Sequence, residues 1–287
     1  MMKILITGSS GYLGKEIIRF LEKNKFIVNS MTRKKDNSYI WDPENKNINN
    51  EIIDNSDVII NLNGAKIIQP FRRKKLSKII SSRIKPTRLL FETIKKSNTP
   101  PKLIISASAT GFYGNRPNEI IDEKSPKGRG LIPDIVEEWE QNIKLNNTRV
   151  VYLRLGTVID ENSDIYFYMK KYGRIIGANR IGNGLNYFPW ISNLDVCRSI
   201  LHVINKSEIS GPVNIVSNNP IYFKDVMESL NKKINPLVKL PLPEATINMI
   251  FGKLGEEILL SNQRILPTKL KESGFTWLKT SPFGSIT

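Results

Sequence analysis

Three glycines stand at a fixed spacing near the start of the chain, between a short apolar run and a stretch with helical periodicity. The apolar run covers residues 3–7, the glycines are Gly8, Gly11 and Gly14, and helical spacing continues through residues 12–24. This pattern is typical of a strand, a tight turn and a helix in direct succession. The first glycine permits the turn, the second lets backbone N–H groups approach a pyrophosphate, and the third lets helix and strand pack closely. The pattern predicts a dinucleotide site at the amino end of the helix, where unpaired N–H groups favour an anion.

Strand and helix patterns alternate through the first half of the chain. The longest helical stretch ends at a strong breaker, Asn98-Thr99-Pro100-Pro101. We expect strands at residues 3–7, 26–31, 39–41, 57–62, 102–106 and 149–155, and helices at residues 12–24, 74–97 and 132–145. Because strands separated by helices are joined by right-handed crossovers, this order predicts an α/β fold with a Rossmann-type doubly wound parallel sheet.

The character of the sequence changes near residue 160. A glycine-rich stretch leads to Trp190, a helical pattern covers residues 194–203, and residues 211–216 form one more apolar run. We expect residues 1–160 to form the dinucleotide-binding domain, with residues 211–216 completing its sheet. Residues 161–287 are expected to form a smaller, mixed C-terminal cap region on the substrate side.

Composition excludes several classes of protein. The chain has 287 residues, of which 40% are hydrophobic, so it suits a packed interior and not a disordered tail. Its single cysteine, Cys197, excludes a disulfide scaffold and is typical of a reducing compartment, the cytoplasm or a plastid stroma. Neither a signal peptide nor a run of about 18 apolar residues is visible, so no membrane association is expected.

The formal net charge of +16, from 43 basic and 27 acidic side chains, attracts phosphates in general. The basic residues are scattered, however, and the densest cluster, from Arg72 to Arg88, lacks the interleaved aromatic side chains on which bases stack. Lysine, isoleucine and asparagine, whose codons are rich in A and T, are frequent, so genome composition accounts for the charge. We therefore expect a small-molecule substrate and no nucleic-acid partner.

The residues after the second expected strand bear on the choice of dinucleotide. A site that prefers NAD places an acidic side chain there to bind the ribose hydroxyls. Here Thr32-Arg33-Lys34-Lys35 offers a hydroxyl and three cations before the first carboxylate, Asp36. Cationic donors suit the adenosine 2′-phosphate, so the sequence favours NADP(H). An ordinary surface position for Arg33 is the alternative.

The glycine loop, Asn61-Leu62-Asn63-Gly64-Ala65 and the segment from Ser106 to Gly114 together resemble short-chain dehydrogenase/reductases of an extended or atypical kind. Shorter pieces such as Trp41-Asp42-Pro43 and Phe188-Pro189-Trp190-Ile191 are similar to the NAD-dependent epimerase/dehydratase-like "epimerase family" proteins, some of which carry a cell-division-inhibitor label. The resemblance implies a Rossmann-type fold that binds NADP(H). It implies cofactor contacts from Gly8, Ser10, Gly11, Tyr12, Leu13, Gly14, Thr32, Arg33, Leu62, Asn63, Gly64, Arg83 and Val158.

The same resemblance implies a serine that orients the substrate, at Ser108, and a Tyr-x-x-x-Lys pair some way after it. That pair is absent, because Ile132 and Val136 occupy the corresponding positions and aliphatic side chains do not transfer protons. Tyr113 is a candidate acid in the loop after the fifth strand, with packing beneath a nicotinamide as its alternative role. Glu140 is a candidate base if it is buried.

Other chemistry-bearing side chains have simpler explanations. Asp195 is expected to cap or brace the start of the following helix, Cys197 is expected to be a small buried hydrophobic residue, and His202 is expected to have a core or surface role and no catalytic one. No spacing of His, Cys, Asp or Glu predicts a metal site. Residues 160–164 and the pair Ser192-Asn193 depart from the family pattern on the presumed substrate side, so the identity of the substrate does not carry over from relatives.

Two functions from different classes remain open. The first is an NADP(H)-dependent oxidoreductase or epimerase-like enzyme for a small sugar-like or carbonyl substrate, which Ser108 polarises. The second is an NADP-binding regulatory protein, acting through a partner in cell or plastid division, that has lost proton transfer. The retained Ser108 and glycine loop favour the enzyme, and the missing tyrosine and lysine favour the regulator.

Overall fold

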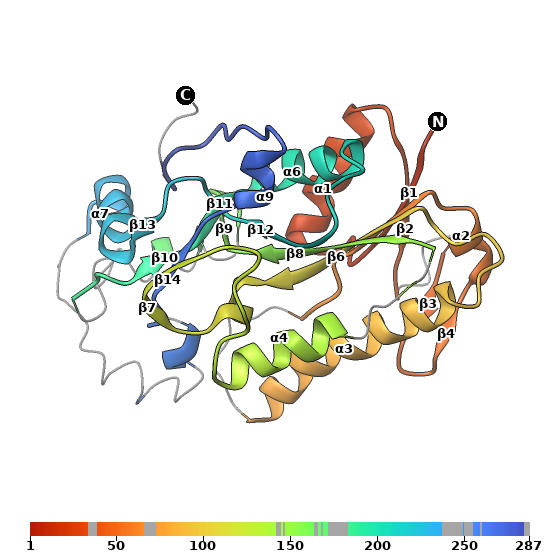
Figure 1. Cartoon of the computed structure of the whole chain (residues 1–287), viewed down its shortest axis with the longest axis horizontal. Coiled ribbons are helices and arrows are strands. Elements are labelled where there is room, and N and C mark those ends of the chain that lie inside the picture. Colours follow the sequence, from red (N-terminus) through yellow and green to blue (C-terminus); the bar gives the residue numbers. More distant parts are fainter. Residues whose placement is uncertain are drawn as a thin grey trace.

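A six-stranded parallel sheet forms the centre of the molecule (Figure 1). The structure, a computed structural model, describes residues 1–33, 39–65, 73–141, 145, 147–163, 166–167, 169–171, 183–236, 249, 255–258 and 260–283, with the side chains of residues 73–76 outside this description. Along the sheet the strands follow the order β12 (Gly211–Ile215), β8 (Arg149–Leu155), β6 (Leu103–Ala109), β5 (Val58–Asn61), β1 (Lys3–Thr7) and β2 (Ile27–Met31). The predicted Rossmann-type α/β fold is confirmed.

Helices cover both faces of this sheet (Figure 1). One face carries α1 (Tyr12–Lys23), α6 (Asn193–Asn205) and α9 (Thr268–Glu272), and the other carries α2 (Asn50–Asp54), α3 (Arg73–Ile94) and α4 (Leu131–Gln141). Successive strand residues point to opposite faces, so Ile4 and Ile6 join the core under α1 and α6 while Leu5 joins the core under α3. Burial on both faces explains why these strands are apolar throughout and not alternating.

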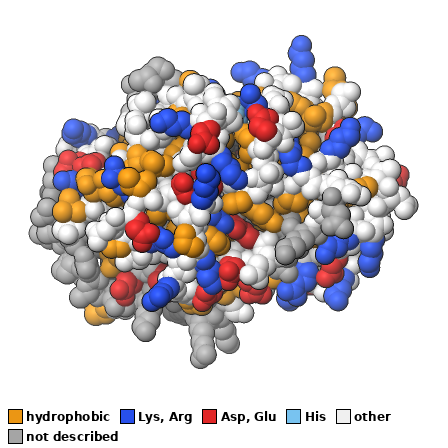
Figure 2. All heavy atoms as spheres, viewed as in Figure 1, with side chains coloured by type: hydrophobic (Ala, Val, Ile, Leu, Met, Phe, Trp, Pro, Cys, Tyr) orange, Lys and Arg blue, Asp and Glu red, His pale blue; other side chains and the backbone are white. Residues whose placement is uncertain are grey.

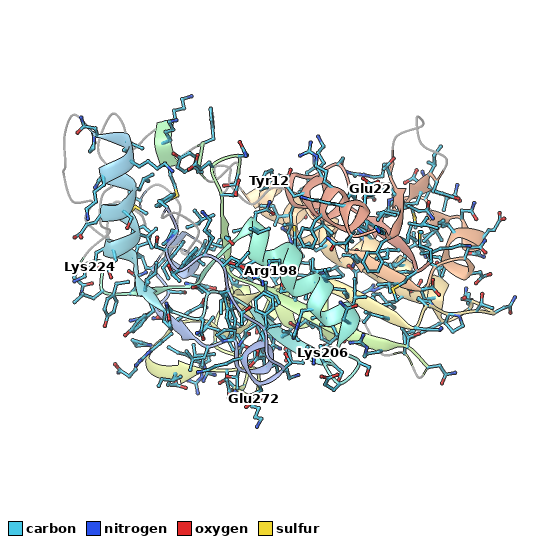
Figure 3. All side chains as sticks on the ribbon, turned by 90° about the horizontal axis from the view of Figure 1, so that it is seen from above. Tyr12, Glu22, Arg198, Lys206, Lys224 and Glu272 are labelled. Atoms are coloured by element: carbon cyan, nitrogen blue, oxygen red, sulfur yellow. The ribbon has the colours of Figure 1, made fainter. Side chains whose placement is uncertain are left out.

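The helices α1 and α6 lie side by side on their face, as the view from above shows (Figure 3). Tyr12 stands at the start of α1, and Arg198 and Lys206 lie along α6 and at its end. Because β1 ends at Thr7 and α1 begins at Tyr12, the first turn of α1 lies at the carboxyl edge of the parallel strands. This is the edge where α/β proteins bind ligands.

The expected third strand at residues 39–41 is wrong in its extent and pairing. Ile40 makes only an isolated bridge to Thr32, and β3 (Trp41–Asp42) pairs antiparallel with β4 (Asn47–Ile48) in a hairpin. The turn between them returns the chain at once, because Asp42 accepts backbone N–H groups and Lys46 adopts a positive φ of 53°. The expected helix at 132–145 is observed as α4 up to Gln141; residues 142–144 lie outside the described part, and Leu145 is not helical.

Smaller elements from both halves of the chain gather beyond the carboxyl edge of the sheet. Three two-stranded pairs and a helix make up this region: β7 (Arg116–Ile121) with β14 (Gln263–Ile265), β9 (Thr157–Ile159) with β11 (Trp190–Ser192), β10 (Tyr187–Phe188) with β13 (Ile221–Tyr222), and α7 (Phe223–Ile234). The short 3-10 helix η1 (Thr110–Tyr113) follows β6 directly. A separate apolar cluster around Trp190, Phe223 and Leu230 supports the region.

The surface carries basic and acidic side chains in a mixed arrangement over the face shown in Figure 2. Among the described residues, no helix has both the length and the apolar character that crossing a bilayer requires.

Candidate functional site

The glycine loop between β1 and α1 has no room for side chains at two of its three glycines. A Cβ on Gly8, whose φ is +73°, would lie 2.5 Å from the carbonyl oxygen of Leu62, and a Cβ on Gly14 would lie 2.6 Å from the carbonyl oxygen of Gly8. At Gly11 the closest atom would be 3.4 Å away. Gly8 and Gly14 are therefore required by the fold itself, whereas a Cβ at Gly11 would make only an ordinary van der Waals contact with Gly8 O.

The first turn of α1 offers donors to a ligand. Gly11 is the N-cap residue and has no side chain with which to cap the helix, and the first turn contains no acidic residue. The N–H of Lys15 is the first that reaches back to Gly11 O, at 3.0 Å, so the N–H groups before it have no partner within the helix. Together with the helix dipole, these groups fit a phosphate; Tyr12 and Leu13 belong to this turn, and Ser10 directly precedes its N-cap.

Apolar side chains border this turn. Leu13, Leu62 and Val158 are half-buried and pack at the margin of the core beneath α1 and α6. The Tyr12 hydroxyl donates a hydrogen bond of 2.6 Å to Asp160 Oδ1, and burial together with that carboxylate raises the pKa of the phenol. The bond connects the glycine loop to the segment after β9, where the sequence departs from the family pattern.

A buried polar network lies at the carboxyl ends of β1, β5 and β6. The side chain of Asn61 is fully buried and accepts a hydrogen bond from Thr7 Oγ1 at 2.9 Å. It donates to Thr87 Oγ1 at 3.0 Å and to Ser106 Oγ at 3.1 Å. Asn63 Nδ2 in turn donates to Thr7 Oγ1 at 2.7 Å. This network fixes the loop of residues 61–65, which borders the glycine loop through Leu62.

Arg83 of α3 closes the other side of that loop. Its guanidinium donates to Ala65 O at 3.1 Å and to Ile79 O at 2.9 Å, and a Cβ on Gly64 would lie 2.9 Å from its Cζ. Burial lowers its pKa to about 10. In the part of the chain that the structure describes, no carboxylate forms an ion pair with this cation, so it has charge to offer an anionic ligand.

The residues predicted to bind the 2′-phosphate follow β2. The backbone of Thr32 is fixed by its N–H to Tyr39 O at 3.1 Å and by Trp41 N–H to Thr32 O at 3.0 Å. Arg33 is exposed, at the edge of the sheet beyond β2. Lys34 and Lys35, the other cations of the motif, lie outside the described residues.

Ser108 lies near the end of β6 and belongs to a chain of charged hydrogen bonds. Its Oγ donates to Glu140 Oε1 of α4 at 2.6 Å. The same carboxylate accepts two hydrogen bonds from Arg154 of β8, from Nε at 2.9 Å and from Nη2 at 2.7 Å. The two ion-pair partners are nearly buried, with 11% of the Glu140 side chain and 5% of the Arg154 side chain exposed.

Tyr113 lies in the interior and not in an open position. It is fully buried, donates its hydroxyl to Asn214 Oδ1 at 2.7 Å, and accepts from Arg154 Nη1 at 2.9 Å. Burial raises its pKa to about 12, although Arg154 opposes this. This geometry supports a structural role for Tyr113. It does not support the predicted role of Tyr113 as an acid.

Aliphatic side chains occupy the positions of the missing Tyr-x-x-x-Lys pair. A Cβ on Gly111 would lie 2.5 Å from Ile132 Cγ2 and 3.8 Å from Val136 Cγ2, so both aliphatic side chains lie against the loop after β6. Sequence reasoning named Glu140 but missed Arg154 as its partner. The available signal was Arg154 between two leucines in a central strand, where a buried cation requires a counterion.

The other candidates have structural environments. Cys197 is buried in the core, where burial raises its pKa to about 12. Asp195 accepts backbone N–H groups from Leu278 and Lys279 at 3.0 Å, so it braces the C-terminal segment as well as its own helix. Among the described residues, no three His, Cys, Asp or Glu side chains come together as metal ligands.

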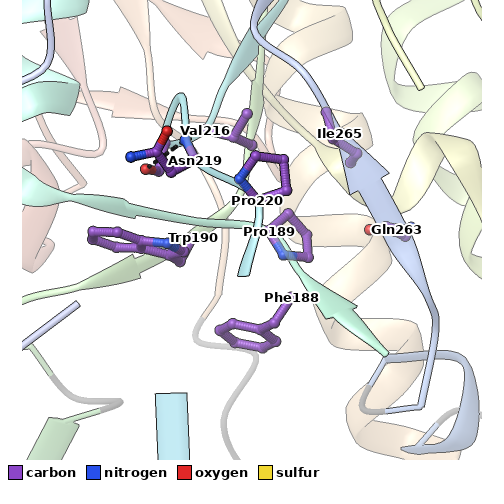
Figure 4. A pocket seen from close by; sticks show the side chains of 9 residues that line it. Phe188, Pro189, Trp190, Val216, Asn219, Pro220, Gln263 and Ile265 are labelled. Carbon is purple, nitrogen blue, oxygen red and sulfur yellow. Dashed lines mark hydrogen bonds between the residues drawn. The ribbon is translucent and has the colours of Figure 1, made fainter. Parts of the chain in front are cut away.

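A small cavity lies beside the carboxyl end of β12 (Figure 4). Trp190, Val216, Asn219 and Gln263 are among the residues that line it. Its volume is about 10 Å³, which suits one water molecule and not a substrate. Trp190 Nε1 is buried and has no hydrogen-bond partner among the residues that the structure describes.

Comparisons with known proteins agree with this fold. The profile of the NAD-dependent epimerase/dehydratase family matches residues 4–130, and a domain of unknown function (DUF1731) matches residues 242–279. The epimerase family protein ML0860 of Mycobacterium leprae is 30% identical over 281 residues, which cover 95% of this chain and 90% of that protein.

Two solved structures share the fold. The human epimerase family protein SDR39U1, crystallised with NADPH, has a TM-score of 0.84 and 22% identity, covering 98% of this chain and 97% of its own. A nucleoside-diphosphate sugar epimerase from Corynebacterium glutamicum has a TM-score of 0.77 and 27% identity, covering 98% of this chain and 56% of its own. With its short-chain dehydrogenase/reductase fold and its glycine loop, the chain belongs to the epimerase family of NAD-dependent epimerase/dehydratase-like proteins.

Proposed function

We propose that the protein binds NADP(H) at the glycine loop and uses it to oxidise, reduce or epimerise a small substrate that carries a hydroxyl or carbonyl group. The observation that carries this proposal is the set of phosphate-binding features around the glycine loop: a Gly11 without a side chain, uncapped N–H groups on α1, and the cation of Arg83 across the loop of residues 61–65. The human relative SDR39U1 was crystallised with NADPH, which supports the same cofactor here. The cofactor would supply hydride exchange at its nicotinamide.

Different residues of this chain would bind different parts of the cofactor. The first turn of α1, with Ser10, Tyr12 and Leu13, would hold the pyrophosphate. Thr32 and Arg33 would hold the 2′-phosphate, because a hydroxyl and an exposed guanidinium at the end of β2 suit a dianion and offer no carboxylate to free ribose hydroxyls. Leu62, Asn63 and Val158 would lie against the adenosine and nicotinamide parts of the bound cofactor.

Ser108 would contact the substrate. It ends the buried part of β6 at the ligand-binding edge of the sheet, and the residue is 3% exposed. A substrate held there would be shielded from water, which strengthens each hydrogen bond that it makes. The compartment that we propose for the protein is the cytoplasm or a plastid stroma, and we expect no nucleic-acid partner.

The experiment that tests the enzyme is turnover of NADPH with a defined set of carbonyl compounds and nucleotide sugars: propionaldehyde, butane-2,3-dione, 4-nitrobenzaldehyde and UDP-glucose. Loss of the absorbance of reduced nicotinamide in the wild-type protein, abolished in Ser108→Ala, is the expected result. Ser199→Ala is the matched control, because Ser199 is a buried serine whose hydroxyl bonds Val196 O within α6. Equal rates in Ser108→Ala and the wild type would contradict the role of Ser108.

A second candidate function follows from the aliphatic side chains at positions 132 and 136. Without a tyrosine and a lysine there, the protein could bind NADP(H) as a structural or sensing element and act through a protein partner. Cofactor binding without turnover of any compound in the set would favour this regulatory function.

A further inference from the structure

Ser108 has a single hydroxyl hydrogen, and that hydrogen points to Glu140. The Oγ–Oε1 distance of 2.6 Å is short, as expected when a hydroxyl donates to a carboxylate. With its hydrogen committed, Oγ has only lone pairs to offer to a ligand. Ser108 is therefore prepared to accept a hydrogen bond from a substrate alcohol, and it donates to a substrate carbonyl only when Glu140 holds a proton of its own.

We propose that Ser108 and Glu140 form a proton relay that takes the place of the absent Tyr-x-x-x-Lys pair. This inference rests on the proposed function. When an alcohol is oxidised, the substrate O–H proton passes to Ser108 Oγ while the Ser108 proton passes to Glu140 Oε1. The C–H bond breaks with its electron pair going to an oxidised nicotinamide dinucleotide, and the C–O bond becomes a carbonyl. Reduction of a carbonyl runs the same transfers in reverse, starting from protonated Glu140.

Glu140 stands where it can replace the missing pair. It follows Val136 by four residues on α4, so the two side chains share one face of the helix. Val136 and Ile132 lie against the loop that follows β6. The Glu140 carboxylate therefore reaches the end of β6 from the same helix and the same side as the usual tyrosine and lysine positions.

Arg154 is a positioning residue in this arrangement. Its two bonds to Glu140 hold the carboxylate with one oxygen toward Ser108, while its guanidinium lies 3.5 Å from the centroid of the Phe112 ring. Its third nitrogen contacts the hydroxyl of Tyr113, which Asn214 also fixes. A cation held from three sides cannot move with the proton, so the carboxylate stays in place through both protonation states.

The charged and titratable groups that face Glu140 come from two strands. Arg154 and Tyr152 face it from β8, and Ser108 faces it from β6. Burial and the negative charge of Glu140 raise the pKa of Tyr152 to about 12, so this phenol stays protonated and does not compete as a base. Among the described neighbours of Ser108, Glu140 is the carboxylate that its hydroxyl contacts.

The test compares Ser108→Ala, Glu140→Gln and the control Glu137→Gln, which lies on the same helix and pairs with Lys127 at the surface. NADPH affinity, kcat with the fastest compound of the set above, and the dependence of kcat on the fraction of D₂O are measured for each. The relay predicts that kcat falls about 100-fold or more in the first two variants while NADPH affinity stays within about two-fold. It also predicts a curved dependence on D₂O in the wild type, because two protons move together.

Glu140→Gln leaves Arg154 without a charged partner and can lower stability, whereas Ser108→Ala keeps the ion pair intact. The second readout therefore does not depend on the activity of Glu140→Gln: it follows the carboxyl-carbon NMR signal of Glu140 in Ser108→Ala, and Glu140→Gln serves only to assign that signal by its loss. Its position is expected to move in Ser108→Ala and to stay in Ser199→Ala. An unmoved signal would contradict the relay whether or not turnover is found.

The outcomes separate the two proposals. Turnover in the wild type with kcat of Glu140→Gln within about three-fold of it, or a linear dependence on D₂O, would overturn the relay and leave the proposed function standing. Tight NADPH binding with no turnover of any compound would overturn the proposed enzyme, and the relay with it.

Discussion

The guanidinium of Arg83 lies over the indole of Trp139, with its Cζ 5.4 Å from the ring centroid. The indole is itself fixed, because its Nε1 donates to Thr87 Oγ1 at 3.3 Å, and Thr87 accepts from Asn61. The cation is thus attached to the polar network at the end of the sheet, stacked on an aromatic ring and left without a carboxylate partner in the described chain. Such an arrangement holds a positive charge ready for a phosphate.

Arg83→Met should weaken NADPH binding while leaving the fold in place. The methionine keeps an apolar stem against Trp139 but removes the charge, and hydrogen bonds to charged groups contribute about 1.5–3 kcal/mol, equivalent to a loss of about ten- to 100-fold in affinity. Fluorescence titration with NADPH measures the loss. Arg88→Met, an exposed arginine on the same helix, is the control and should bind as the wild type does. Equal affinity in the two variants would remove Arg83 from the site.

Two glycines of the loop should behave differently when each is changed to alanine. Gly14→Ala places a Cβ 2.6 Å from Gly8 O, so we expect a clear loss of thermal stability together with cofactor binding. Gly11→Ala meets its nearest atom at 3.4 Å, so the fold should tolerate it. The added methyl group would instead occupy space needed by the pyrophosphate, and NADPH affinity should fall about ten-fold or more. Calorimetric melting and NADPH titration of both variants provide the comparison, and a Gly11→Ala protein that binds normally would argue against phosphate contact at this turn.

Arg33→Asp should reverse the preference between the two coenzymes. The carboxylate repels the 2′-phosphate and can accept ribose hydroxyls, so NADPH affinity should fall and NADH affinity should rise. The ratio of the two dissociation constants, measured side by side, is the readout. If NADPH binding is as tight in Arg33→Asp as in the wild type, the 2′-phosphate lies elsewhere.

The single histidine of the chain provides a direct test of burial. His202 contacts Ser273 Oγ through Nε2 at 2.8 Å and lies edge-on to Phe275, and burial lowers its pKa below the ordinary value of about 6.5. Below that value the unfolded chain binds more protons than the folded protein, so stability should rise with pH across this window and fall on acidification. NMR titration of the ring protons should give a midpoint below that of a free imidazole. Urea unfolding of His202→Gln should show a flatter dependence on pH between about pH 5 and 7.

Local patterns predicted the sheet well because they depend on neighbours in sequence. The strand at residues 149–155 and the helix from Tyr12 follow from apolar spacing, and the glycine loop follows from turn geometry. The third strand failed because only tertiary contacts decide whether so short a segment pairs with β2 or with the following hairpin. Predicted strands and helices do not contain such information.

The polar interior was harder to predict because its partners are distant in sequence. Ser108, Glu140 and Arg154 come from three elements, and Tyr113 meets Asn214 across 101 positions. A single sequence shows that a buried strand contains an arginine, but not which carboxylate balances it. Tyr113 was predicted as an acid from its loop, and only the packing around it shows that its hydroxyl is enclosed.

The central claim is that the turn between β1 and α1 binds NADP(H). Isothermal titration calorimetry of the full chain with NADPH, and separately with NADH, tests it most directly. We predict a saturable signal with one site per chain for NADPH and a weaker one for NADH. Absence of heat with both coenzymes, together with an unchanged melting temperature in their presence, would contradict the account.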